Sequence, residues 1–329
     1  MINFRYHVVS ILAVFLALAI GTVMGASFVG RGVIDRLNDR ITSVRKNADG
    51  VRAEKETLQG RVDKLETYRD ETAAFTVARS LTGLRVNLVA ERGVDGGVVD
   101  AQATLLRQGA ATVPGVIWLE DVWKLDSAES LASLRPATGL TSRDRSTLRT
   151  AAAQLLGKRL GAAPAALALP DPTTPAPTTP APTEDLLTKL AAAKFISLAG
   201  VVGSPTPVAA DFVASASRVL ELGGPGHAVP TDVIPTVAAG VWSGGTPAVV
   251  GQVFTESDAT PERGSWVDAI ADQESIRNHV STVDDVESLE GRVGATLALA
   301  ELSLGTVGNY GVDRERAVPE KLGTVPSAK

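Results

Sequence analysis

The sequence predicts an α/β domain that follows one membrane-spanning helix and a parallel coiled coil. Residues 8–30 are uncharged and mostly apolar, residues 31–76 repeat apolar side chains in heptads, and residues 84–312 alternate short apolar runs with amphipathic ones. Strands that alternate with helices form a mainly parallel sheet, so the domain is expected to be Rossmann-like or flavodoxin-like. A short tail at 1–7 and a flexible tail at 313–329 complete the expected division.

The apolar segment 8–30 is long enough to cross a bilayer. Its 23 residues would form a helix of about 34 Å, against a hydrocarbon core of roughly 30 Å. Gly21 and Gly25 have the small-residue spacing that lets two membrane helices approach closely, which indicates a self-associating anchor. A cleavable signal peptide ending before Ala26 is the alternative.

The direction of insertion is predicted from two opposing features. Arg5 precedes the segment and five cations follow it, which by the positive-inside rule would put the domain in the cytoplasm; these are Arg31, Arg36, Arg40, Arg45 and Lys46. However, they belong to a charged helix, and a Pro/Thr-rich loop at 164–183 resembles segments of exported proteins. We expect an extracytoplasmic domain; a loop insertion without a role is the other interpretation of the tract.

Apolar residues after the membrane segment recur at alternating steps of three and four. The a positions are mostly β-branched or small and the d positions carry Val and Leu, which favours two parallel strands. The predicted interface is Ile34, Leu37, Ile41, Val44, Ala48, Val51, Leu58, Val62 and Leu65. Lys55 occupies one a position, and Arg61 and Glu66 form an attractive pair between chains, whereas Arg40 and Arg45 repel. We expect a homodimer whose coil docks partners; an amphipathic helix packed on its own domain is the alternative.

Within the domain the period of apolar residues changes repeatedly between that of strands and that of helices. Strands are expected at 85–90, 115–119, 195–198, 218–222 and 248–253, and helices at 100–108, 142–160, 184–194, 231–240 and 289–304. A capping-box-like run from Thr141 to Asp144 opens the second of these helices.

Composition excludes several kinds of site. A net charge of −5 and a pI near 5.4 leave no basic footprint for nucleic acid, and the absence of cysteine excludes disulfides and thiolate chemistry. Glycine-rich loops begin at Gly93 and Gly223, but neither has a nucleotide-binding spacing, so turns are the expected role.

Metal and catalytic residues are scarce. Only His279, with Asp284, Asp285 or Glu287, suggests a partial metal cluster, and a surface histidine is the expected reading. Ser281, His279 and Asp284 are the residue types of a hydrolytic triad. Their closeness in sequence does not by itself give the spatial arrangement that a triad needs. We expect no catalytic residue, no cofactor and no enzyme.

Both ends of the chain resemble the actinobacterial MctB-like envelope proteins, a family named for mycobacterial copper transport protein B. The resemblance rests on MINFRYHVVSILAVFLALAIGTVMGA at the start and on VSTVDDVESLEGRVGATLALAELSLGTVGNYG near the end. It implies copper efflux or homeostasis, with a proposed channel and an outer-envelope location. Relatives of the SteB type imply a cell-separation role instead, in which an anchored coil docks a peptidoglycan hydrolase and works with a partner membrane protein.

The residues favour the second implication. A channel needs a closed barrel or a bundle of spans, whereas the chain offers one span, α/β alternation and few copper ligands. We therefore expect a membrane-anchored, dimeric, non-catalytic scaffold or regulator of the envelope. Copper transport and a nucleotide- or small-ligand-binding sensor are the alternatives.

Overall fold

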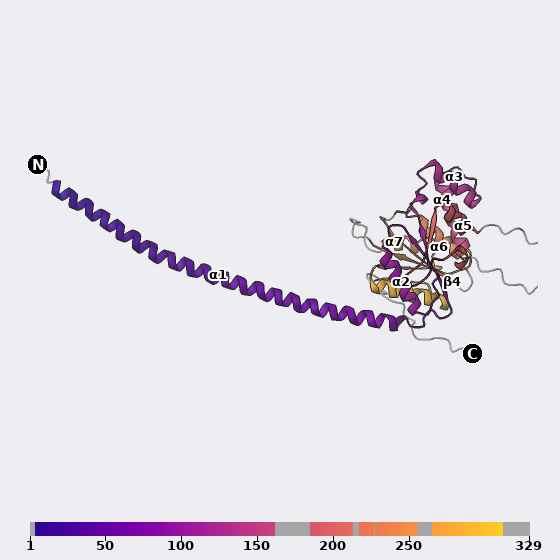
Figure 1. The fold of residues 1–329 in the computed structure, drawn as a ribbon, viewed down its shortest axis with the longest axis horizontal. Coiled ribbons are helices and arrows are strands. Elements are labelled where there is room, and N and C mark those ends of the chain that lie inside the picture. Colours follow the sequence, from indigo (N-terminus) through magenta and orange to yellow (C-terminus); the bar gives the residue numbers. More distant parts are fainter. Residues whose placement is uncertain (1–3, 162–184, 213–216, 227, 255–264, 312–329) are drawn as a thin grey trace, which may run out of the picture. The chain divides into compact units, whose positions relative to one another are not determined.

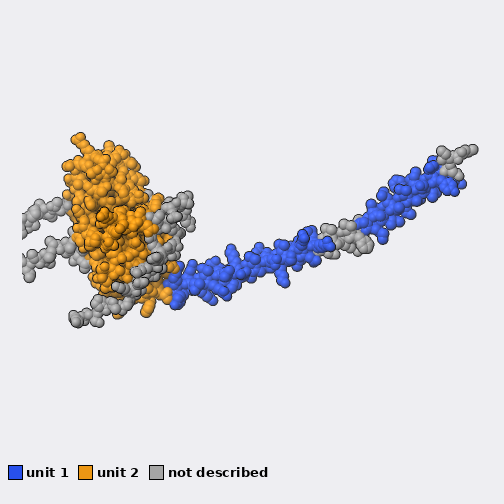
Figure 2. Space-filling view, turned by 180° about the vertical axis from the view of Figure 1, so that it is seen from behind, with its two compact units in different colours: residues 1–69 blue, residues 70–329 orange. Residues whose placement is uncertain are grey.

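The computed structural model describes residues 4–161, 185–212, 217–226, 228–254 and 265–311, with the backbone alone for 26–35 and 265 (Figure 1). The predicted Pro/Thr loop and C-terminal tail lie outside these residues. The chain divides into two compact units, residues 1–69 and 70–329, which Figure 2 colours separately.

The first unit is the greater part of one helix, α1 (Phe4–Val77). Its stretch Phe4–Gly25 has a mean hydropathy of 2.5, is wholly exposed, and is long and apolar enough to cross a membrane. The predicted apolar helix at the N-terminus is therefore confirmed, although it begins four residues before Val8. The same helix continues from this stretch into the predicted coil, and neither Gly50 nor Gly60 interrupts it.

The final turns of α1 belong to the second unit, where they pack on its helices. Ala73 and Val77 are buried and contact Leu105 and Leu297 in a small apolar cluster. The free part of the helix therefore ends shortly before Ala73.

The second unit is built on a seven-stranded mixed sheet. Its strands are β1 (Arg85–Glu91), β2 (Val116–Leu119), β3 (Ile196–Ala199), β4 (Ser217–Gly223), β5 (Ala248–Gln252), β6 (Val280–Val283) and β7 (Asn309–Tyr310). Their order is β3-β2-β1-β4-β5-β6-β7, and only β3 runs antiparallel to its neighbour. The expected mainly parallel sheet is confirmed, and the order is that of the Rossmann fold rather than the flavodoxin fold.

Helices cover both faces of this sheet. They are α2 (Gly96–Gln108), α3 (Ala128–Thr138), α4 (Arg145–Gly161), α5 (Leu186–Ala192), α6 (Val233–Ser243), α7 (Ser265–Ala271) and α8 (Leu289–Glu301), with short 3₁₀ turns at Asp121–Lys124, Ala209–Asp211 and Leu302–Leu304. One large buried cluster joins the sheet to α3, α4, α5 and α6, and another joins its opposite face to α2 and α8. The domain is a three-layer α/β/α sandwich.

Helices α4 and α6 cross with their backbones in contact. A Cβ built on Gly157 would lie 2.1 Å from the Val237 carbonyl oxygen, and one on Gly240 would lie 2.5 Å from that of Gln154. Thr246 Oγ1 donates a 2.7 Å hydrogen bond to the carbonyl of Gly161 at the same crossing. Glycine at 157 and 240 is thus required by packing, which the sequence pattern alone did not reveal.

The structure corrects several details of the expected elements. Helix α4 begins at Arg145 rather than Ser142, because Asp144 is itself the cap: its Oδ1 accepts the Thr147 amide at 2.7 Å. Strands β6 and β7 and helices α3 and α7 were not predicted. Strand β6 carries polar Ser281 and Thr282 between its valines, and β7 has only two residues. Helix α3 contains Pro136, which usually ends a helix.

Candidate functional site

The predicted coil interface forms an exposed apolar stripe along the first unit. Between residues 37 and 65 its large side chains are 41% to 67% exposed; they are Leu37, Ile41, Val44, Val51, Leu58, Val62 and Leu65. Ala48 is exposed as well, and the side chain of Ile34 lies outside the described residues. A contiguous exposed apolar stripe is typical of a surface that packs against another helix or partner. We call it the seam.

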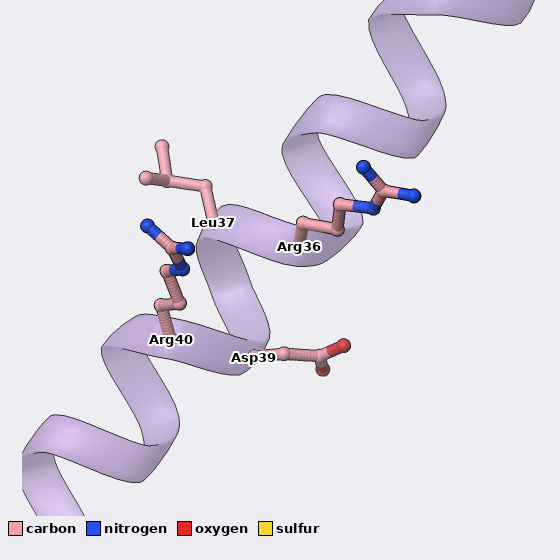
Figure 3. Close-up of a pocket in the computed structure, with 4 residues that line it drawn as sticks. All are labelled: Arg36, Leu37, Asp39 and Arg40. Atoms are coloured by element: carbon pink, nitrogen blue, oxygen red, sulfur yellow. The ribbon is translucent and has the colours of Figure 1, made fainter.

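Near the start of the seam, one charged side chain borders it and two lie on the outward face. In Figure 3, Leu37 and Arg40 project to one side of the helix, and Arg36 and Asp39 to the other. The hollow that these four residues line is open and walled by a single helix, so it is a surface rather than a small-molecule pocket.

Gly21 and Gly25 lie on a different side of α1 from the seam. Nothing lies within 4 Å of a Cβ built on either, so their face is open. Gly25 precedes Ile34 by nine residues, which in a continuous helix is a rotation of about half a turn. The two glycines therefore occupy outward positions when the seam faces a second copy.

The residues suggested for metal binding are separated by strand β6. His279 precedes it and Asp284 follows it, five residues or about 16 Å further along. The His279 ring instead stacks on Trp242, with centroids 4.1 Å apart and planes 9° apart. In the described part of the chain, no group of three or more His, Asp or Glu side chains could hold a metal ion.

The same separation applies to the residue types of a triad. Ser281 is buried, and its Oγ accepts the Gly308 amide at 3.2 Å, so it ties β6 to the segment before β7. The structure does not bring Ser281, His279 and Asp284 together as nucleophile, base and orienting acid.

Asp284 and Asp285, at the carboxyl end of β6, pack against other segments of the domain. Asp285 adopts a left-handed conformation (φ 51°), and its carbonyl would clash with any Cβ on Gly291, which would lie 2.2 Å away. Asp284 packs against Gly311, and its amide donates to the Tyr310 carbonyl at 3.1 Å. Residues 283–285 (VDD) and 308–311 (GNYG) thus pack on one another. Both segments lie in the stretch that carries the family resemblance near the C-terminus.

The loops that begin at Gly93 and Gly223 follow the neighbouring strands β1 and β4. After β1 the chain turns to α2 on one face of the sheet, and after β4 it turns to α6 on the other. This switch point is where open α/β sheets bind ligands. Glu91 lies there, 1% exposed, and accepts the Gly224 amide at 2.6 Å. A Cβ on Gly223 would lie 2.5 Å from Glu91 Oε1, so this glycine makes room for the carboxyl group.

Two acidic side chains accept hydrogen bonds from backbone amides of these two glycine-rich loops. Glu91 accepts from Gly224, and Asp95 accepts the Gly97 amide at 2.8 Å as the N-cap of α2. Burial raises the pKa of Glu91 to about 8, although the hydrogen bond from Gly224 opposes this. Because the Gly224 and Gly97 amides already donate to these side chains, they are not free to bind a pyrophosphate.

The sheet interior holds further polar side chains that the sequence analysis missed. Glu221 on β4 is fully buried, and burial raises its pKa well above the ordinary value. Gln252 ends β5 in register with Gly223 and is also fully buried. Within the described residues neither side chain has a hydrogen-bond partner. A polar residue inside an apolar strand run is the signal that could have revealed them.

Comparison with known proteins gives one consistent result. The family described as "Copper transport outer membrane protein, MctB" matches residues 1–319. Proteins named "Copper transporter MctB" from Mycobacterium tuberculosis (strain H37Rv) and Mycobacterium bovis are each 25% identical over 318 residues, which is 94% of this chain and 96% of theirs. The match spans the apolar helix, the heptads and the α/β domain alike, so the chain belongs to the MctB family.

Proposed function

We propose that this protein is a membrane-anchored, non-catalytic scaffold or regulator of the cell envelope that works as a parallel dimer. The observation that carries the proposal is the seam, whose seven large apolar side chains stay exposed from Leu37 to Leu65. Such a stripe with heptad spacing gains its stability by burying a and d side chains against another helix.

The anchor supports a parallel arrangement. One apolar helix, Phe4–Gly25, precedes the seam in the same continuous helix, so two copies inserted in the same direction start their heptads at the same height. In that register Arg61 of one copy faces Glu66 of the other. We further propose that the α/β domain is extracytoplasmic and that the coil engages a peptidoglycan hydrolase and a partner membrane protein.

Copper transport or homeostasis is the second candidate function, favoured by the printed names of the family and of the mycobacterial relatives. The chain itself offers two methionines and no cysteine, and its described residues contain no cluster of potential ligands. Copper handling would therefore depend on ligands brought together in an assembly.

One experiment on envelope membranes separates the two functions. The full chain is compared with a seam variant, Val51→Asp/Leu58→Asp/Val62→Asp, and with a control of the same substitutions on outward positions, Ala53→Asp/Thr57→Asp/Lys64→Asp. Chemical crosslinking reports the dimer, affinity isolation reports a co-purified peptidoglycan hydrolase, and elemental analysis reports copper.

We expect the seam variant to lose both the dimer and the hydrolase, the control to keep both, and every form to lack stoichiometric copper. A seam variant that still dimerises and binds the hydrolase would contradict the scaffold. Copper bound at stoichiometry without a seam-dependent partner would establish the second function instead.

A further inference from the structure

The residues that border the seam in its membrane-proximal half carry charge of one sign. In the heptads that run from Ile34, the bordering e and g positions between residues 38 and 52 are Asn38, Arg40, Arg45, Asn47 and Arg52. All five side chains are exposed, and none is acidic. In a parallel two-stranded coil, a g residue lies beside the e residue of the next heptad of the other chain, so Arg40 faces Arg45 of the second copy.

The acidic residues of this stretch do not neutralise these bordering arginines. Asp39 and Asp49 fall at outward positions, and Figure 3 shows Asp39 directed away from Arg40. Arg52 approaches Asp49 at 3.9 Å, but both side chains are more than 70% exposed, where an ion pair contributes little. Arg40 and Arg45 form no ion pair with any described residue.

The membrane-distal half of the coil has the opposite character. There Arg61 faces Glu66 of the second copy, and Glu54 faces Gln59, so two identical chains attract or tolerate each other. The distal heptads thus suit self-association, and the proximal heptads carry a repulsion that a second copy does not relieve.

We propose that residues 38–52 of the dimer form a docking strip for an acidic helix of a partner protein, while the distal heptads hold the two copies together. The inference rests on the proposed dimer. Each side of the coil presents Arg40 of one copy with Arg45 and Arg52 of the other, spread over about 18 Å. That length matches about three turns of a helix with Asp or Glu along one face. Such a helix neutralises the strip, which a second copy of this chain does not.

Anionic lipid is the competing occupant, and distance disfavours it. Arg40 lies 15 residues beyond Gly25, about 22 Å along the helix axis, and Arg52 lies about 40 Å beyond it. The headgroup layer is about 6 Å thick on each side, and screening at physiological salt has a length of about 8 Å. With the axis along the membrane normal, the strip stands clear of the bilayer.

The test uses the full chain carrying Leu58→Cys, reconstituted in nanodiscs of phosphatidylcholine. Because the natural chain has no cysteine, disulfide formation at position 58 reports the dimer without background. The probe is a fluorescent alanine-rich helical peptide with glutamate along one face and no apolar seam; its partner peptide has glutamine at the same positions. Arg40→Glu alters the strip, and Arg36→Glu makes the same charge change on the outward face.

We expect the acidic peptide to bind and the glutamine peptide not to bind. Arg40→Glu should weaken binding about tenfold, since it replaces an attraction by a repulsion in each strip. The same variant should increase the yield of the disulfide at position 58, because Glu at position 40 attracts Arg45 of the second copy. Arg36→Glu should change neither readout.

Equal binding of the two peptides, or equal losses in Arg40→Glu and Arg36→Glu, would overturn the docking strip. So would displacement of the acidic peptide when phosphatidylglycerol replaces part of the phosphatidylcholine, which would assign the strip to anionic lipid. Absence of the disulfide at position 58 in the Leu58→Cys parent chain would instead overturn the dimer on which the inference rests.

Discussion

The two units of this protein handle apolar surface in opposite ways. The second unit buries its large side chains on both faces of the sheet, from Trp123 to Tyr310, and most of these are fully inaccessible to solvent. The first unit leaves every described seam side chain open. A region that completes its own core needs no partner to fold, whereas an exposed heptad stripe is stabilised by another helix. The difference supports the proposal that the helix carries the interaction surface and that the domain is a self-contained support.

Glycine shows the same contrast. Gly157 and Gly240 in the domain have backbone atoms within 3 Å of where a Cβ would stand, whereas Gly50 and Gly60 in α1 have nothing within 4 Å. The domain glycines are packing requirements. Gly50 and Gly60 lower the intrinsic stability of the helix, and a side chain at either position would meet no described atom within 4 Å.

The largest effect should come from Gly157→Leu. The new side chain would collide with the backbone of α6, and we expect the free energy of unfolding of the domain to fall by about 3 kcal/mol or more. Thermal unfolding of the detergent-solubilised chain, followed by near-ultraviolet circular dichroism, measures this. Gly60→Leu is the matched control and should leave the domain transition in place; an unchanged transition in Gly157→Leu would refute the close crossing of α4 and α6.

The next effect is a pH dependence of the domain's stability. Between about pH 4.5 and 8 the folded state keeps the Glu91 proton that the unfolded chain releases, so this stabilisation is complete below pH 4.5 and is lost as the pH rises through 8. The slope is about 1.4 kcal/mol per pH unit within that window. Glu221, whose pKa burial also raises, acts in the same direction.

Glu91→Gln should therefore flatten the fall in the domain's melting temperature between pH 5 and pH 8, while the wild-type chain shows it. Parallel melting curves for wild type and variant at every pH would remove Glu91 from this account.

A smaller, stabilising effect is expected from Gly60→Ala. Alanine is favoured over glycine in a helix interior by about 1 kcal/mol, and the position is open. Far-ultraviolet circular dichroism should show the coil unfolding at a higher temperature, with the domain transition unchanged. A lower coil transition would mean that the outward face at residue 60 is itself packed against something.

The smallest expected effect belongs to the membrane segment. Because Gly25 lies about half a turn from the seam, adding Gly25→Leu to the Leu58→Cys chain should leave the disulfide yield at position 58 unaltered. Loss of that disulfide would show that the glycine face, not the seam, brings two copies together.

Periodicity was sufficient to predict most of the fold. Long apolar or heptad patterns predicted α1, and the buried runs at 85–90 and 248–253 predicted central strands, because burial on both sides imposes a continuous apolar sequence. Short elements with mixed composition, such as β6 and β7, depend on neighbours far along the chain and carry no local signal.

The candidate site was predicted unevenly for the same reason. The seam repeats over several turns and is visible in the sequence, whereas the Glu91 environment arises only where Gly223 and Gly224 come to lie beside β1. His279 and Asp284 are close in the sequence, but an extended strand holds them apart. Closeness along the chain thus does not join the weak metal candidates, and distance along the chain concealed the buried carboxyl group of Glu91.

The most direct test of the account is a cysteine scan of residues 55–66 in the full chain, with oxidative crosslinking in envelope membranes. The absence of natural cysteine makes each crosslink specific to its position. A parallel dimer through the seam predicts maxima at 55, 58, 62 and 65 and minima at Thr57, Gly60 and Lys64. Crosslinks of equal yield at all positions, or maxima at Gly60 and Lys64, would contradict it.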